Sequence, residues 1–425
     1  MIVADSLEAR FAARMGALLG PDFPDNIGLA VSGGGDSMAM LALAHGWARV
    51  MGVGLHVVTV DHGLRPDSAT EAQMVGRECA ALGHPHSVLR WHWDGAGNLQ
   101  DGARAARITL IEQWRGAIEH VLFAHTLDDQ AETVVMRLMR GSGVDGLAAM
   151  AQKRRVLRGA GFWQIRPLLH ETRADLRHYA DTLKLPYVDD PSNDDPRFDR
   201  VRTRHALAVL EGLGLEAANL AATAGRMARA RAALTARVAS VASDILAKDC
   251  TATGQLVFHR DALAAVERET QLRVLAAALQ WVSGAVYRPR AAALEALLDR
   301  ALAGGGGTLH GGHLSVGRAQ IRIFREYNAV RDLVVAAGPG ASWDGQWHMA
   351  SGPDDGRVLR ALGPDGWAQI PEKPRDAPPY DAAQSLPAVF DQGNLVACPA
   401  LQFGPPCDLR LRRPAASFVA FLQLR

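Results

Sequence analysis

Short apolar runs alternate with longer amphipathic segments through the first half of the chain. Each apolar run is followed by a segment with apolar residues at helical spacing. We expect strands at 26–31, 53–60, 86–93, 120–125 and 164–169, and helices at 37–52, 68–83, 99–119, 127–141 and 171–185. This alternation predicts an α/β fold, with a Rossmann-like parallel sheet that carries helices on both faces.

The pattern changes in the second half. From about residue 206 the chain is alanine-rich and helical, and further helical runs at 261–283 and 289–303 precede an alternating stretch, LSVGRAQIRIFRE, that predicts a hairpin. Residues 337–356 are polar and rich in Gly and Pro, which predicts a linker before several short strands. A chain of 425 residues is too long for one core. We therefore expect an α/β domain at 1–208, a mostly helical domain at 209–336, and the linker with a small α+β domain at 337–425.

A glycine-rich loop joins the first expected strand to the first expected helix. Its sequence, SGGGDS at 32–37, places three glycines and two serines where backbone N–H groups and the helix dipole favour an anion. The loop therefore predicts a phosphate site. A Walker loop requires a lysine after its last glycine, and Asp36 stands there instead, which argues against a P-loop NTPase.

Three acids gather on the helix expected at 127–141. Asp128, Asp129 and Glu132 share a face that flanks the buried apolar stripe, where the helix leaves the carboxyl end of a strand. Such acids suit Mg²⁺, an ammonium group or a proton taken from a reacting base. Thr126-x-x-Asp129 also matches a capping box, which explains Asp129 but leaves Asp128 and Glu132 unexplained.

Two further polar segments each allow two interpretations. Asp61 and His62 follow the second strand, and they either face a ligand or only hydrogen-bond within the turn. The segment DDPSNDDPRFDRVRTR at 189–204 is either a solvated charged linker or an arginine cluster that grips phosphates.

Composition and charge argue against several classes of protein. The net charge is +1, and no run of about 18 apolar residues occurs, so we expect no membrane partner. The N-terminal segment carries Asp5 and Glu8 and lacks the apolar core of a secretory signal, so we expect a cytoplasmic protein. The four cysteines lie far apart without a C-x-x-C pair, which argues against a zinc ribbon, an iron–sulfur site or a disulfide framework.

Taken together, these motifs resemble the PP-loop ATP pyrophosphatases. SGGGDS matches their S-G-G-x-D-S motif, and VDHGLR, AHTLDDQAETVVMRLMRGSGVDGLAAM, IRPLL and DDPSNDDPRFDRVRTR follow in the order seen in the tRNA(Ile)-lysidine synthetase family. GGTLHGGHLSVGRAQIRIFRE and LPAVFDQGNLVACPAL resemble the later domains of that family, so the resemblance covers most of the chain. One departure is Ile108, where the family pattern leads us to expect an aromatic residue.

The resemblance implies an ATP-dependent ligation of L-lysine to position 2 of a wobble cytidine, in the isoleucine tRNA that carries a CAU anticodon. An adenylated cytidine would be the intermediate, and AMP and pyrophosphate would be released. The implied cofactors are ATP and Mg²⁺, and the family suggests a homodimer.

The resemblance also implies roles for individual residues. Catalysis would use Asp36, Arg107, Asp129 and Glu132, with Asp36 on Mg²⁺ directly or through water. ATP would bind at Ser32, Gly33, Gly34, Gly35, Asp36, Ser37, Asp61, His62 and His125. Lysine would bind at Asp128, Asp129 and Glu132, and tRNA at Arg104, Arg197, Arg200, Arg202 and Arg204.

The main rival within the superfamily is a tRNA thiolase, but no cysteine lies near residues 125–145 to supply the pair or cluster that such enzymes use. A GMP-synthetase-like enzyme would usually carry a glutaminase domain, and the three expected domains leave no room for one, which argues against this rival. A tRNA-binding protein without catalysis is the rival of a different class, and the presence of Asp36, Asp129 and Glu132 argues against it.

Overall fold

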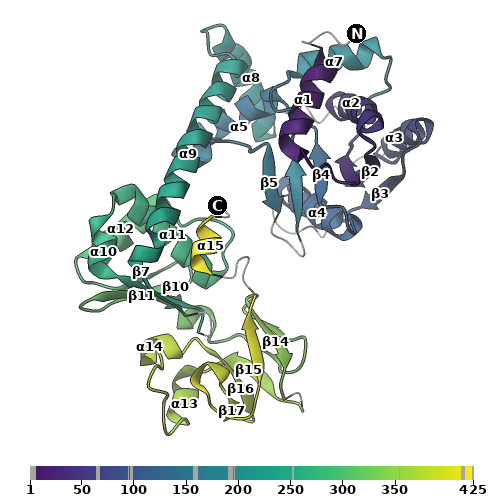
Figure 1. The fold of residues 1–425 in the computed structure, drawn as a ribbon. Coiled ribbons are helices and arrows are strands. Elements are labelled where there is room, and N and C mark those ends of the chain that lie inside the picture. The colour runs from purple at the N-terminus through teal and green to yellow at the C-terminus, as the bar shows by residue number, and fades with distance from the viewer. Residues whose placement is uncertain are drawn as a thin grey trace. The chain divides into compact units, whose positions relative to one another are not determined.

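The computed structural model describes residues 6–63, 68–93, 95, 99–156, 161–189, 195, 197–250, 253–353, 355–412 and 417–423. The parts of VDHGLR and DDPSNDDPRFDRVRTR at 64–65, 190–194 and 196 lie outside this described set. The chain forms two compact units, Met1–Arg231 and Ala232–Arg425. Figure 1 colours the chain by residue number, from purple at the N-terminus to yellow at the C-terminus. The finer boundaries expected at 208/209 and 336/337 remain predictions.

The first unit is built on a six-stranded sheet in the order β3-β2-β1-β4-β6-β5. Five of its strands are parallel, as expected: β1 (Asn26–Ala30), β2 (Gly54–Asp61), β3 (His86–Arg90), β4 (His120–Phe123) and β6 (Phe162–Ile165). The sixth, β5 (Lys153–Val156), pairs antiparallel with β6 at the edge. The expected parallel sheet is therefore confirmed, with one antiparallel edge strand that the sequence pattern did not predict.

Helices follow the strands of this unit in the expected alternation. They are α2 (Gly35–Met51), α3 (Ser68–Leu82), α4 (Leu99–Trp114), α5 (Leu127–Met139) and α7 (Arg173–Thr182). Helix α1 (Leu7–Leu19) precedes β1, α6 (Val144–Leu147) follows α5, α8 (Asp199–Glu211) follows α7, and α9 (Ala217–Ile245) contains the boundary between the two units. Alternate strand residues point to opposite faces of the sheet. Leu29 and Leu122 pack with α1, α2, α3 and α7, whereas Val58 and Val121 pack with Ile111 of α4. Both faces of the sheet are therefore covered by helices, as predicted.

The strand order brings two loops together. Strands β1 and β4 are hydrogen-bonded neighbours, although two other strands separate them in sequence. The loop after β1 leads into α2, and the loop after β4 leads into α5. This is the point where the strand order reverses, and open α/β sheets bind ligands in the crevice at such a point.

The second unit contains a larger sheet than the sequence pattern predicts. Its five antiparallel strands are β7 (Leu246–Cys250), β8 (Gln255–His259), β11 (Gln320–Arg325), β10 (Gly312–Val316) and β9 (Gly307–Leu309). Helices α10 (Arg260–Ala265), α11 (Arg268–Ser283) and α12 (Ala291–Leu302) share one apolar core with them. The expected helices are present, and the expected hairpin corresponds to β10 and β11, while strands β7, β8 and β9 extend it into a sheet that the pattern did not predict.

The last part of the chain forms two small sheets. One is β12 (Val334–Ala336), β15 (Val358–Ala361), β16 (Pro387–Asp391) and β17 (Asn394–Ala397), and the other is β13 (Ser342–Trp343), β14 (Trp347–Ser351) and β18 (Asp408–Leu411). Short helices α13 (Gly363–Ala368) and α14 (Tyr380–Ala383) lie between these strands along the chain. The expected linker at 337–356 therefore contains paired strands, and Trp343 and Met349 within it are completely buried.

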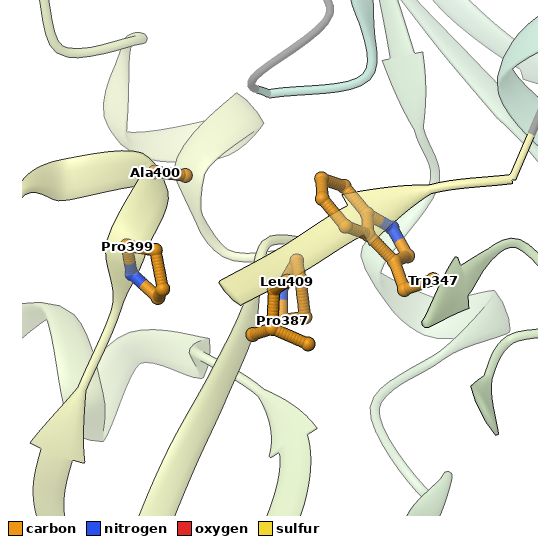
Figure 2. Close-up of a pocket in the computed structure, with 5 residues that line it drawn as sticks. All are labelled: Trp347, Pro387, Pro399, Ala400 and Leu409. Atoms are coloured by element: carbon orange, nitrogen blue, oxygen red, sulfur yellow. The ribbon is translucent and has the colours of Figure 1, made fainter. Parts of the chain in front are cut away.

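The C-terminal helix α15 (Phe418–Gln423) belongs to the core of the five-stranded sheet. Phe418 and Phe421 contact Trp281 of α11, with ring centroids 6.0 and 5.2 Å apart respectively. A hollow elsewhere in this unit is lined by Trp347, Pro387, Pro399, Ala400 and Leu409 (Figure 2). None of these five lining side chains is ionisable, so the hollow offers no acid–base chemistry.

Candidate active site

The glycine-rich loop forms the turn between β1 and α2. Gly33 has φ +91°, a conformation that favours glycine, and Gly34 precedes the first residue of α2. The Ser37 hydroxyl donates to the Gly34 carbonyl at 2.8 Å and accepts the Ser32 N–H at 3.2 Å. These bonds close the loop. Because Gly34 has no side chain to cap α2, the first N–H groups of the helix are left for an anion.

The capping box predicted at the start of α5 is confirmed. The Thr126 hydroxyl accepts the Asp129 N–H, and Asp129 Oδ2 accepts the Thr126 N–H at 2.9 Å. Asp128 also caps a helix, but a different one, since its Oδ2 accepts the backbone N–H of Arg173 at 2.8 Å. Capping thus uses one oxygen of Asp129 and leaves Oδ1 to face other groups.

Arg173, which the sequence analysis missed, occupies the centre of the site. It is the first residue of α7, a helix that packs beside α2, and its side chain reaches acids on two other elements. Its Nε lies 3.3 Å from Asp36 Oδ2, its Nη2 3.6 Å from Asp129 Oδ1, and its Nη1 3.9 Å from Glu132 Oε1. The structure therefore brings the acid of the glycine loop and the acids of α5 around one guanidinium.

Two arginines of α8 also belong to this cluster. Arg204 Nε donates to Glu132 Oε1 at 3.0 Å, and Arg200 Nη1 lies 3.8 Å from Asp129 Oδ1. The other two arginines of the same segment are exposed at the surface. Arg197 pairs with Asp195, and Arg202 pairs with Asp199. The four arginines grouped in sequence thus divide into two that face the acids and two that face solvent.

The acids differ in how readily they ionise. Burial raises the pKa of Asp36 to about 6, against the opposing effect of Arg173. Burial and the neighbouring Asp129 raise the pKa of Glu132 despite its bond from Arg204. Burial also opposes ionisation of Asp129, but the nearby cations and the Thr126 hydrogen bond outweigh it, so its pKa lies below the ordinary value.

Two histidines predicted to bind ATP line the same end of the sheet. Burial lowers the pKa of His125 to about 3 and also lowers the pKa of His62, so both imidazoles are neutral at pH 7. The Nδ1 atoms of both rings are buried without a hydrogen-bond partner in the described parts of the chain. Asp61 instead accepts the Gly63 N–H at 2.9 Å, which supports the simple turn interpretation for that residue.

Arg104 and Arg107 lie on α4, which follows β3. Burial lowers the pKa of Arg107 to about 10, and the positive charges of Arg104 and Arg200 add to this effect. Burial likewise lowers the pKa of Arg104, and Arg200 and Arg154 add to this effect. The arginines are thus close enough to repel one another, and an anionic ligand would relieve that repulsion.

The cysteines and the potential metal ligands bear on which chemistry the site can perform. Cys79 is the sole cysteine of the first unit in the sequence, and burial raises its pKa to about 11. A single buried thiol does not provide the pair that a thiolase requires. Within the described ranges, no group of three or more His, Cys, Asp or Glu side chains is arranged to hold a metal ion alone.

The described helices include none that is both long enough and apolar enough to cross a bilayer.

A family model described as a PP-loop domain matches residues 7–211. Among solved structures, the U34-tRNA thiolase NcsA from Methanococcus maripaludis gives a TM-score of 0.44 at 16% identity, over 52% of this chain and 78% of that chain.

Curated relatives match most of the chain. The tRNA(Ile)-lysidine synthase of Ruegeria pomeroyi is 41% identical over 403 residues, which are 93% of this chain and 92% of that protein. The tRNA(Ile)-lysidine synthase of a Bradyrhizobium species is 40% identical over 319 residues, which are 71% of this chain and 88% of that protein. With its ATP-binding PP-loop domain and these relatives, the chain belongs to the tRNA(Ile)-lysidine synthase family.

Proposed function

We propose that this protein uses ATP to ligate L-lysine to position 2 of the wobble cytidine of the CAU-anticodon isoleucine tRNA. The observation that carries the assignment is the meeting of Asp36 from the glycine loop with Asp129 and Glu132 from α5 around Arg173. One site can then hold a nucleotide on one side and an amine on the other, as a two-step ligation requires.

In the first step, the cytosine 2-oxygen attacks the α-phosphorus of ATP. The bond between the α-phosphorus and the bridging oxygen breaks, and pyrophosphate leaves. The loop Ser32–Ser37 would hold the phosphates at the start of α2, because N–H groups and the helix dipole favour anions there. Arg107 would offset charge on the adenylate, and neutral His62 and His125 would border the nucleotide without adding charge. Phosphoryl transfer of this kind depends mainly on positioning and charge neutralisation.

In the second step, the ε-amine of lysine attacks ring carbon 2, and AMP leaves with the former 2-oxygen. The ammonium form of lysine must first lose a proton, since its ordinary pKa is about 10.4. Asp129 stays ionised and would hold the ammonium group, whereas Glu132, whose pKa is raised, is the better acceptor for its proton. Asp128 is a second candidate, although one of its oxygens already caps α7.

Magnesium fits this donor set as a metal held chiefly by the nucleotide. Mg²⁺ usually takes one or two carboxylates and completes its shell with phosphates and waters. Asp36 is half-buried at the end of the glycine loop and would supply that carboxylate. When bound, the ion would neutralise charge on the phosphates.

Binding of tRNA would depend on the exposed arginines. Arg197 and Arg202 lie at the surface, where tRNA phosphates would compete with their aspartate partners, and Arg104 would add a further contact. Arg200 and Arg204 were also expected to bind tRNA, but they face Asp129 and Glu132, so they would affect tRNA binding only indirectly, through these acids. Phosphate contacts of this kind position an RNA and do not specify its sequence. We also propose that the protein forms a homodimer, as the family suggests.

A direct assay tests the proposed function. Purified protein, ATP, radiolabelled lysine and an isoleucine tRNA transcript with a CAU anticodon should give labelled tRNA, with release of AMP and pyrophosphate. The methionine tRNA transcript, which shares the CAU anticodon, is the control and should remain unlabelled. Absence of label in the isoleucine transcript would contradict the assignment, and label in both transcripts would contradict the substrate specificity.

A further inference from the structure

Arg173 lies between two sets of acids that the proposed chemistry uses separately. Its Nε lies 3.3 Å from Asp36 on the nucleotide side, and its two Nη atoms lie 3.6 Å from Asp129 and 3.9 Å from Glu132 on the lysine side. A lysine ammonium group and this guanidinium would therefore compete for the same two carboxylates of α5.

The stability of α7 does not explain why an arginine stands at this position. Arg173 is the first residue of the helix, where the dipole disfavours a cation by about 0.3–1 kcal/mol. The start of α7 is capped by the Thr172 hydroxyl and by the Asp128 carboxylate, which accepts the backbone N–H of Arg173. These bonds fix the backbone of Arg173 and make no use of its side chain.

The contacts of the guanidinium are those of an exchangeable cation. The Nε–Asp36 contact is a hydrogen bond, but the contacts to Asp129 and Glu132 are longer than hydrogen bonds. Each nitrogen faces a different carboxylate, so the strong bidentate arrangement of an arginine–carboxylate pair is absent from these contacts. Glu132 also has an oxygen, Oε2, that is buried without a partner among the described residues, and a second cation would satisfy it.

We propose that Arg173 is a positioning residue that competes with the lysine ammonium group for Asp129 and Glu132 and is drawn away from them when a nucleotide binds beside Asp36. The inference rests on the proposed function. The phosphates of ATP would lie close to Arg173 Nε, and a guanidinium matches phosphate oxygens as well as it matches carboxylates. Nucleotide binding would then free the two acids for lysine, so that lysine binds after the nucleotide.

This competition is a coupling between two ligands and can be measured at equilibrium. Radiolabelled L-lysine is titrated into the full-length protein with and without α,β-methylene ATP, whose bridging carbon prevents cleavage. The isoleucine transcript is present in every sample. In the wild type, the analogue should tighten lysine binding at least about fivefold. In Arg173→Met, lysine should already bind tightly without nucleotide, and the analogue should add little.

Control variants separate this role from a structural one. His178→Met changes an exposed side chain of the same helix and should keep the wild-type dependence on nucleotide. Arg173→Lys keeps the positive charge and should also keep the wild-type dependence of lysine binding on nucleotide. Arg173→Gln, which lacks the charge, should behave as Arg173→Met and decides the question if the methionine variant fails to fold in thermal melts.

The outcomes distinguish the inference from the function on which it rests. If folded Arg173→Met or Arg173→Gln binds lysine no more tightly than the wild type without nucleotide, or keeps the full nucleotide effect, the inference is overturned and the proposed function stands. If the wild type binds no lysine under any of these conditions, the proposed function falls and the inference falls with it.

Discussion

Glu132 uses its two carboxylate oxygens differently, and Arg204 defines the difference. Oε1 accepts a hydrogen bond from Arg204 Nε at 3.0 Å, whereas Oε2 is buried with no partner in the described parts of the chain. A buried acceptor without a partner costs about 1–3 kcal/mol, so a structural role alone does not account for Glu132 at this position. The arginine holds the carboxylate in place, and the second oxygen stays available to an ammonium group or a proton.

The first prediction concerns this carboxylate. Glu132→Gln keeps the shape of the side chain but cannot take a proton from lysine, so the second step should slow by about 10²–10⁴ while adenylation continues. Adenylated tRNA labelled from α-³²P-ATP should then accumulate. Glu211→Gln, an exposed change on α8, should have no such effect. Wild-type lysine incorporation by Glu132→Gln would exclude the proposed role.

The second prediction concerns the acid of the glycine loop. Asp36→Asn removes the carboxylate proposed for Mg²⁺, which would cost several kcal/mol of charge stabilisation, so ATP-dependent pyrophosphate release should fall by about 10² or more. Retention of tRNA on filters should change little, because the exposed arginines are untouched. Asp22→Asn at the exposed turn before β1 is the matched control. Pyrophosphate release at the wild-type rate would remove Asp36 from the chemistry.

The third prediction separates capping from lysine binding at Asp128. Asp128→Ala removes the acceptor for the Arg173 N–H and should lower the free energy of unfolding by about 0.5–2 kcal/mol. Asp128→Asn keeps an acceptor oxygen and should unfold like the wild type in urea. A KM for lysine that rises in Asp128→Asn at unchanged stability would show that the charge serves lysine as well.

The fourth prediction distinguishes the two pairs of arginines. Arg197 is 84% exposed at its side chain and Arg202 is 56% exposed, so each should contact tRNA phosphates directly. Replacing either by alanine should weaken tRNA binding and reduce the slope of log affinity against log salt by about 0.7–0.9. Arg204→Ala should mainly impair the second step, because its partner is Glu132. An unchanged salt slope after both exposed arginines are removed would locate the tRNA contacts elsewhere.

The sequence predicts well the elements whose burial gives a clear periodic signal. Strands β1, β2, β4 and β6 contain buried apolar residues because both faces of the sheet are covered there, whereas the edge strand β3 has no buried residue. Each of the five parallel strands was expected within a few residues of its place. Strand β5, with the sequence KRRV, was missed because an edge strand exposes charged side chains and lacks that signal. The segment at 337–356 was wrongly predicted as a linker for the opposite reason, since its many turn residues surround several buried positions, Trp343 and Met349 among them.

The site was predictable where a motif fixes both residue type and position. Asp36, Asp129 and Glu132 follow strands β1 and β4, whose neighbouring carboxyl ends bring them together. Arg173 was not predicted because it lies on α7, a different helix, and only the three-dimensional structure shows that it lies close to those acids. The division of the arginines at 197–204 was equally hidden, since it depends on which face of α8 meets α5.

The last prediction concerns stability and the buried imidazole of His125. Burial lowers the pKa of His125 to about 3 in the folded protein, whereas an exposed imidazole titrates near about 6.5. Between these values the unfolded chain binds a proton that the folded protein does not. The free energy of unfolding should therefore fall as the pH drops below about 6.5, by up to about 1.4 kcal/mol per pH unit for this group. His125→Phe removes the group, so urea unfolding from about pH 7.5 to about pH 5 should show the variant gaining stability relative to the wild type as the pH falls. The exposed His205→Phe is the control and should follow the wild type. Parallel curves for the wild type and His125→Phe would mean that the imidazole is not held neutral by the fold.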